Sequence, residues 1–118
     1  MLQRLSQFVR YAFGARSISV ESESPTRLEL RYGYTRTIFD KPSQQVVQGG
    51  KPVATLPLVE RVELHQPRDQ EGPLNWFVTI HVKGSRRVEV GQITDETEAS
   101  MIGARIASIV DKPVVVGR

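Results

Sequence analysis

The chain has 118 residues, of which 39% are hydrophobic and 25% are charged, a balance typical of one folded domain rather than of a disordered chain. The absence of cysteine excludes a disulfide framework and thiolate metal sites, and no apolar run approaches the roughly 18 residues of a membrane-spanning helix, so we expect a cytoplasmic protein. Basic residues number 16 and acidic residues 13, and the resulting net charge of +3 permits an anionic partner without requiring one.

Residues 1–16 have the pattern of a short amphipathic helix with a basic surface. Apolar residues at positions 2, 5, 8, 9 and 12 follow the spacing of one helical face, and Gly14 is a stop signal. Three interpretations remain open: the helix packs on the following domain of residues 17–118, lies on an anionic membrane surface, or is an organellar transit peptide. The candidate membrane or partner contacts of this segment are Arg4, Phe8, Arg10 and Arg16.

From residue 18 the apolar period becomes two, which predicts a series of half-buried strands. The alternation places Tyr32 and Tyr34 on the apolar face of one strand, so we expect both rings in the core. Gly49-Gly50 favours a tight reversal between two short strands. The strands predicted in this half of the chain span residues 18–21, 27–34, 36–39, 46–47 and 53–56.

Segment 58–82 predicts a long antiparallel hairpin, because both of its arms alternate between apolar and polar residues. If Leu64 lies opposite Trp76, then Leu58 lies opposite Val82 and the apolar faces of the two arms coincide. A slip of one residue would turn the whole apolar set toward solvent.

A second hairpin follows at Gly84-Ser85. A two-residue turn there would put Val88 and Val90 on the wrong face of the sheet. We therefore expect a three-residue turn or a bulge that places Val82 opposite Val88.

The C-terminal part predicts one amphipathic helix. Thr94 and Asp95 are both candidate N-caps, and Glu98 stands in the capping-box position relative to Asp95. Gly103 is small enough to let the helix approach the sheet closely, and Pro113 ends the helix before a short extended segment. The apolar stripe of the helix consists of Ala99, Ile102, Gly103, Ile106, Ile109 and Val110.

These elements predict an α+β fold that is mainly β. About seven antiparallel strands form a curved sheet or a partly open barrel, and the C-terminal helix closes it, with a short amphipathic helix at the N-terminus. 

The second half of the chain also carries a resemblance. Its order is a strand at 76–82, a glycine turn, a strand with Val88 and Val90, and a helix ending in Lys112-Pro113. This order resembles the pleckstrin-homology-like domains of bacterial proteins. The resemblance implies a binding or scaffolding role at the cytoplasmic face of a membrane. In phosphoinositide-binding members a basic cluster surrounds the first hairpin, and the nearest match in this chain is Arg27, Arg31 and Arg36.

No catalytic, cofactor or metal site is predicted. His65 and His81 lie on one face of the predicted hairpin, too far apart to share an ion. Gly49-Gly50 lacks the Lys-Ser pair and the helix that a phosphate loop needs. Asp95 and Glu96 stand at a helix start, where the helix dipole accounts for them. We therefore expect a binding protein and not an enzyme.

Two classes of partner remain open. The first is a protein or an anionic lipid surface, and the second is single-stranded nucleic acid, which aromatic and arginine side chains would bind by stacking and phosphate contacts. Phe77 is the one aromatic residue expected to point outward from its strand. Its face fits either a homo-oligomer contact or a cover formed by the N-terminal helix. The candidate basic surface consists of Arg27, Arg31, Arg36, Arg86 and Arg87.

Overall fold

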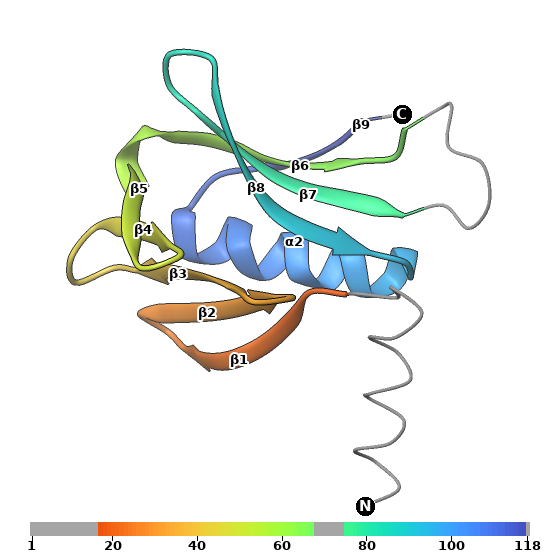
Figure 1. Cartoon of the computed structure of the whole chain (residues 1–118). Helices are drawn as coiled ribbons and strands as arrows, with labels where there is room; N and C mark the ends of the chain where they lie inside the picture. Colours follow the sequence, from red (N-terminus) through yellow and green to blue (C-terminus); the bar gives the residue numbers. More distant parts are fainter. Residues whose placement is uncertain (1–16, 68–74, 118) are drawn as a thin grey trace, which may run out of the picture.

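The computed structural model describes residues 17–67 and 75–117, which form nine β-strands, one α-helix and one 3-10 turn. The predicted N-terminal helix, with the candidate contacts Arg4, Phe8, Arg10 and Arg16, lies outside the described residues. The strands form two sheets, and helix α2 (Glu96–Val110) lies between them (Figure 1). The prediction of a mainly β protein with a C-terminal helix is confirmed. The prediction of about seven strands in one curved sheet or barrel is wrong, because nine strands divide between two separate sheets.

The first sheet is an antiparallel meander in which each strand pairs with the next along the chain. Its inward side chains, which include Leu28, Leu30, Phe39 and Val46, are almost completely buried. Because these residues alternate with polar ones, one face of the sheet joins the core and the other remains at the surface. The five strands are β1 (Ser19–Ser24), β2 (Arg27–Tyr32), β3 (Thr35–Asp40), β4 (Gln45–Gln48) and β5 (Lys51–Thr55).

The turn between β2 and β3 corrects the prediction for Tyr34. Tyr32 pairs with Thr35, so Gly33 and Tyr34 form a two-residue turn, and Gly33 has the positive φ of 63° that such turns favour at their first central position. The strand therefore ends before the alternation does. Tyr34 is 98% exposed and not in the core, whereas Tyr32 is partly buried against it.

The second sheet has the strand order β8-β7-β6-β9. Leu64 pairs with Val78 and Val62 with Ile80, two residues away from the predicted register. The apolar faces still coincide, because a shift by two residues leaves each side chain on the same face. The strands are β6 (Val59–His65), β7 (Trp76–Val82), β8 (Arg86–Ile93) and β9 (Val114–Gly117), and β9 pairs in parallel with β6.

Two irregularities set which residues of this sheet point inward. The pairing of β6 with β7 shifts between Val59 and Arg61, so that Val59 is completely buried while Leu58, in the 3-10 turn η1 (Leu56–Leu58), is 44% exposed. The predicted core position of Leu58 is therefore wrong. The turn between β7 and β8 has three residues, as predicted, but it pairs Val82 with Arg86. Val88 consequently lies opposite Ile80 and not opposite Val82.

Helix α2 follows the predicted pattern closely. Asp95 is its N-cap and accepts a hydrogen bond from the backbone N–H of Thr97 at 3.1 Å. The helix ends at Val110, because Asp111 adopts the left-handed conformation with a φ of 59°, two residues before Pro113. All six residues of the predicted stripe are buried. No helix in the described ranges is long and apolar enough to cross a membrane.

Strand β8 joins the two sheets at one side of the molecule (Figure 1). The backbone N–H of Ile18 donates to the carbonyl of Gln92 at 3.0 Å, and the Gln48 side chain donates to the carbonyl of Glu89 at 2.8 Å. Arg86 similarly reaches the carbonyl of Val53 at 2.7 Å. Two of these three contacts use side chains, so this junction is not a continuous backbone ladder and the sheets do not close into a barrel.

Candidate functional site

The structure separates the five arginines of the predicted basic surface. Arg27 lies beside the β1–β2 turn, where its Nη2 is 3.6 Å from Glu29 Oε1. Arg86 and Arg87 lie at the start of β8 in the other sheet, and Arg86 is bound to the carbonyl of Val53. Arg27 and Arg87 therefore lie apart from the remaining two, and the guanidinium of Arg86 is held by the backbone of β5.

Arg31 and Arg36 are brought together, since they lie directly opposite each other on β2 and β3 next to the Gly33-Tyr34 turn. The carbonyl of Arg36 also accepts a hydrogen bond from the backbone N–H of Gly49 at 3.0 Å. The β4–β5 turn, and Lys51 which follows it, therefore lies at the same end of the sheet. We call this region the basic hairpin end, and it consists of Arg31, Tyr34, Arg36 and Lys51.

The charges of the basic hairpin end are only partly neutralised. Arg31 Nε lies 2.7 Å from Glu21 Oε1, so its charge is balanced by a neighbour on β1. Arg36 and Lys51 are exposed, and neither makes an ion pair with any residue that the structure describes. Two cations and an almost fully exposed tyrosine ring are thus available to a partner at this end of the sheet.

The aromatic residues do not form the stacking surface that the nucleic-acid hypothesis needs. Trp76 is 6% exposed and belongs to the core, and Tyr32 packs against the same core. Phe77 is half-buried on the outer face of the second sheet, where it pairs with His65. Tyr34 alone among these four rings is well exposed.

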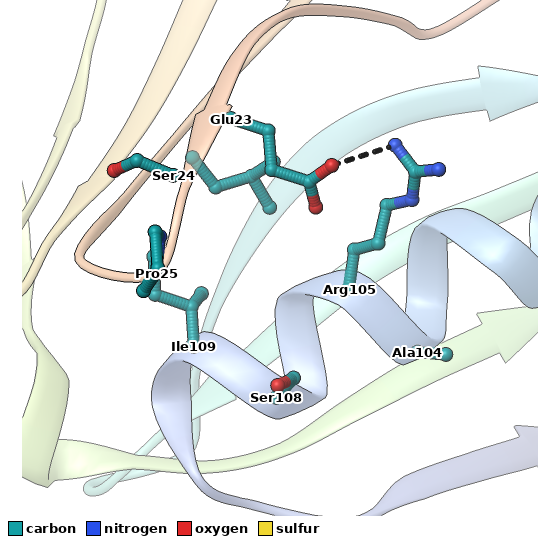
Figure 2. A pocket seen from close by; sticks show the side chains of 8 residues that line it. Glu23, Ser24, Pro25, Ala104, Arg105, Ser108 and Ile109 are labelled. Carbon is teal, nitrogen blue, oxygen red and sulfur yellow. Dashed lines mark hydrogen bonds and ion pairs between the residues drawn. The ribbon is translucent and has the colours of Figure 1, made fainter.

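A shallow pocket of about 230 Å³ lies between the β1–β2 turn and helix α2 (Figure 2). Arg105 Nη1 reaches across it to Glu23 Oε1 at 3.1 Å, so the two charges satisfy each other. The Ser24 hydroxyl accepts hydrogen bonds from the backbone N–H groups of Thr26 and Arg27. The lining therefore contains no nucleophile paired with a base, and it does not have the arrangement of a catalytic site.

The outer face of the second sheet contains a polar cluster centred on His81, which is only 8% exposed. Arg61 Nη2 lies 3.1 Å from His81 Nδ1, and Glu63 Oε2 lies 3.3 Å from His81 Nε2 without good hydrogen-bond alignment. His65 is on the same face, as predicted, and pairs with Phe77. In the described ranges, no group of three or more His, Cys, Asp or Glu side chains could hold a metal ion.

Sequence reasoning missed Lys51 and the exposure of Tyr34. A signal for Tyr34 was present, because glycine followed by one residue between two alternating segments is a common hairpin turn. Lys51 was not recognisable, since its position at the same end of the sheet as Arg36 depends on how β3, β4 and β5 pair.

Comparison of the chain with protein families, with curated proteins and with solved structures finds no match. The functional argument therefore rests on the chain's own residues.

Proposed function

We propose that this domain is a non-catalytic binding module that attaches peripherally to anionic membrane surfaces through the basic hairpin end. The observation that carries the proposal is the 98% exposure of Tyr34 at an end of the sheet that also carries two cations without an acidic partner among the described residues. A tyrosine ring has an apolar body and a polar tip, and it is stable at the level of lipid headgroups.

The energetics favour a lipid surface over a single small ligand. Each lysine or arginine near an anionic bilayer contributes about 1 kcal/mol, and this contribution does not require a shaped cavity. Arg36 and Lys51 are exposed on neighbouring hairpins, an arrangement that suits many diffuse headgroup contacts. The sequence of residues 1–16, which lies outside the described residues, contains three further arginines that would add to the same attraction.

The resemblance to pleckstrin-homology-like domains motivates the membrane assignment, and the described strands and helix have part of the expected order. A strand meander is followed by a second antiparallel sheet, and a C-terminal helix packs on both. The parallel pairing of β9 with β6 is an addition to the predicted pattern.

The test is co-sedimentation of the full chain with vesicles of phosphatidylcholine alone and of phosphatidylcholine mixed with phosphatidylserine, at low and moderate salt. The wild-type chain should bind only the mixed vesicles, less tightly as salt rises. Arg36→Gln combined with Lys51→Gln should weaken binding about 25-fold, and Tyr34→Ala should weaken it further.

The matched control is Lys41→Gln combined with Lys83→Gln. It removes the same charge from two exposed turns away from the basic hairpin end and should leave most of the binding intact. Equal losses in the two double variants would show that net charge alone attracts the membrane, and this result would overturn the assignment of the site. A wild-type chain that binds neither kind of vesicle but binds a single-stranded oligonucleotide would favour the nucleic-acid alternative.

A further inference from the structure

Strand β9 forms an edge of the second sheet and has β6 as its one neighbour among the described strands. It consists of Val114, Val115, Val116 and Gly117, and carries no charge. Val115 is 41% exposed and Val116 is 51% exposed. An exposed, uncharged apolar edge of this kind is a template for pairing with another strand.

The other sheet edges have structural features that hinder such pairing. The pairing of edge strand β1 shifts between Val20 and Ser22, and both of its glutamates are held in ion pairs. Edge strand β5 contains Lys51 and Pro52 and pairs irregularly with β4. Strand β8 lies against the first sheet through its carbonyl groups. Edge protection is therefore general in the described strands, and β9 is the exception.

The hydrogen bonds of β9 leave specific groups at the open edge. The backbone N–H of Val62 donates to the carbonyl of Pro113 at 2.9 Å. In a parallel ladder, every second residue of a strand directs both its N–H and its C=O group to the same neighbouring strand. Since Pro113 points to β6, the N–H and C=O groups of Val115 also point to β6. The backbone groups of Val114 and Val116 consequently face away from β6, toward a further strand.

The side chains of β9 continue the two faces of the sheet. Val114 lies beside Val62 and Val116 beside Leu64, on the inner face, whereas Val115 lies beside Glu63 on the outer face. The inner apolar layer therefore stops at a half-exposed valine. A strand that continued it would need apolar residues at the inner positions.

We propose that β9 pairs antiparallel with β9 of a second copy of this chain, across a two-fold axis at Val115. In this register Val114 lies opposite Val116 of the second copy, and the two Val115 residues lie opposite each other. Inner positions then meet inner positions, valine meets valine at all three sites, and no like charges within the strand oppose each other. The two four-stranded sheets become one sheet of eight strands, in the two-fold arrangement that is commonest among homo-oligomers.

The first test measures the oligomeric state of the full chain by light scattering and sedimentation over a range of concentrations. Val116→Pro removes the outward N–H without affecting the ladder to β6, and it should raise the dimer dissociation constant about 30-fold by removing two hydrogen bonds. Val116→Thr is the matched control, because it keeps the N–H and the branched shape, and it should remain dimeric. A wild-type chain that is monomeric throughout, or a dimer that Val116→Pro does not weaken, would overturn the proposal.

A second test does not depend on how well the proline variant folds. The chain contains no cysteine, so a single introduced thiol reports one contact. In the proposed register the two Val115 residues form a pair without mutual hydrogen bonds, with Cα atoms about 4.5 Å apart, which is within reach of a disulfide. Val115→Cys should cross-link rapidly under mild oxidation, whereas Tyr34→Cys, at a position that is more exposed than Val115, should not. Cross-linking at equal rates in both variants, or in neither, would contradict the register.

Discussion

Gly91 on β8 approaches the ring of Tyr32 on β2 so closely that a Cβ atom at position 91 would lie 2.5 Å from Tyr32 Cγ. The same atom would lie 2.8 Å from Ile18 Cγ1. Gly91 also has a φ of 154°. This glycine is therefore the point at which β8 crosses the first sheet, and the two sheets meet there because it has no side chain.

Replacing Gly91 by alanine should destabilise the protein by about 3 kcal/mol, because both the ring and the backbone must move. Gly84→Ala is the control: it also changes a glycine with positive φ, but a Cβ there meets nothing within 4 Å, and its cost should be about 1 kcal/mol. Urea unfolding of the two variants measures the difference. Equal midpoint shifts would show that the close approach does not determine how the sheets join.

The helix cap provides a second prediction. The carboxylate of Asp95 accepts the backbone N–H of Thr97 at 3.1 Å, while Thr94, the other candidate cap, is exposed. Asp95→Ala should therefore lower the free energy of unfolding by about 1 kcal/mol, and Thr94→Ala should change it little. Thermal unfolding followed by circular dichroism compares them. A larger effect from Thr94→Ala would mean that the helix begins one residue earlier.

Much of the fold was predictable because local patterns specify it. The alternation of β2 and β7 and the apolar stripe of α2 each follow from burial of one face, so the inner residues were identified before the pairing was known. The register of β6 against β7 was not predictable, because a shift by two residues buries the same face. The parallel partner of β9 depends on how α2 returns the chain to β6.

The candidate site was less predictable than the fold. In the sequence, Arg27, Arg31 and Arg36 are four and five residues apart along two adjoining strands, and no local feature distinguishes them as binding residues. Pairing places Arg31 opposite Arg36 but Arg27 opposite Asp40, at the other end of the same two strands. The two cations of the basic hairpin end that have no ion pair with a described residue are thus selected by strand pairing and by the position of Glu21, which are long-range features.

Gly103 and Leu64 provide a third prediction. A Cβ atom at position 103 would lie 3.2 Å from Leu64 Cδ2 and 3.3 Å from Cδ1, and Leu64 is only 2% exposed. Alanine would gain about 1 kcal/mol of helix propensity but would push against a side chain with little room to move. We expect Gly103→Ala to destabilise the protein by about 1 kcal/mol.

The sign should reverse when Leu64 is also shortened. In a Leu64→Ala background the space beside Gly103 is open, so Gly103→Ala should stabilise the protein by about 1 kcal/mol, which gives a coupling of about 2 kcal/mol in the double-mutant cycle. Chemical unfolding of all four proteins measures this coupling. A coupling near zero would show that the helix can shift on β6, and that the glycine is not needed for their close packing.

Asp40 provides a prediction about pH. The pKa of its carboxyl group is lowered from the ordinary value of 3.8, first by hydrogen bonds from the side chain and backbone of Ser43, and to a lesser degree by the charge of Arg27. The backbone N–H of Ser43 lies 3.1 Å from Asp40 Oδ2. A group whose pKa is depressed by folding stabilises the native state above its unfolded pKa, and this contribution is lost as the pH falls through the folded pKa.

Ser43→Ala should therefore raise the pKa of Asp40 toward 3.8, which NMR titration of the side-chain carboxyl carbon measures directly. The control is Ser24→Ala, which removes the corresponding hydroxyl of the β1–β2 turn and should leave the pKa of Asp40 unchanged. A Ser43→Ala titration curve identical to that of the wild type would show that the Ser43 hydroxyl does not lower this pKa.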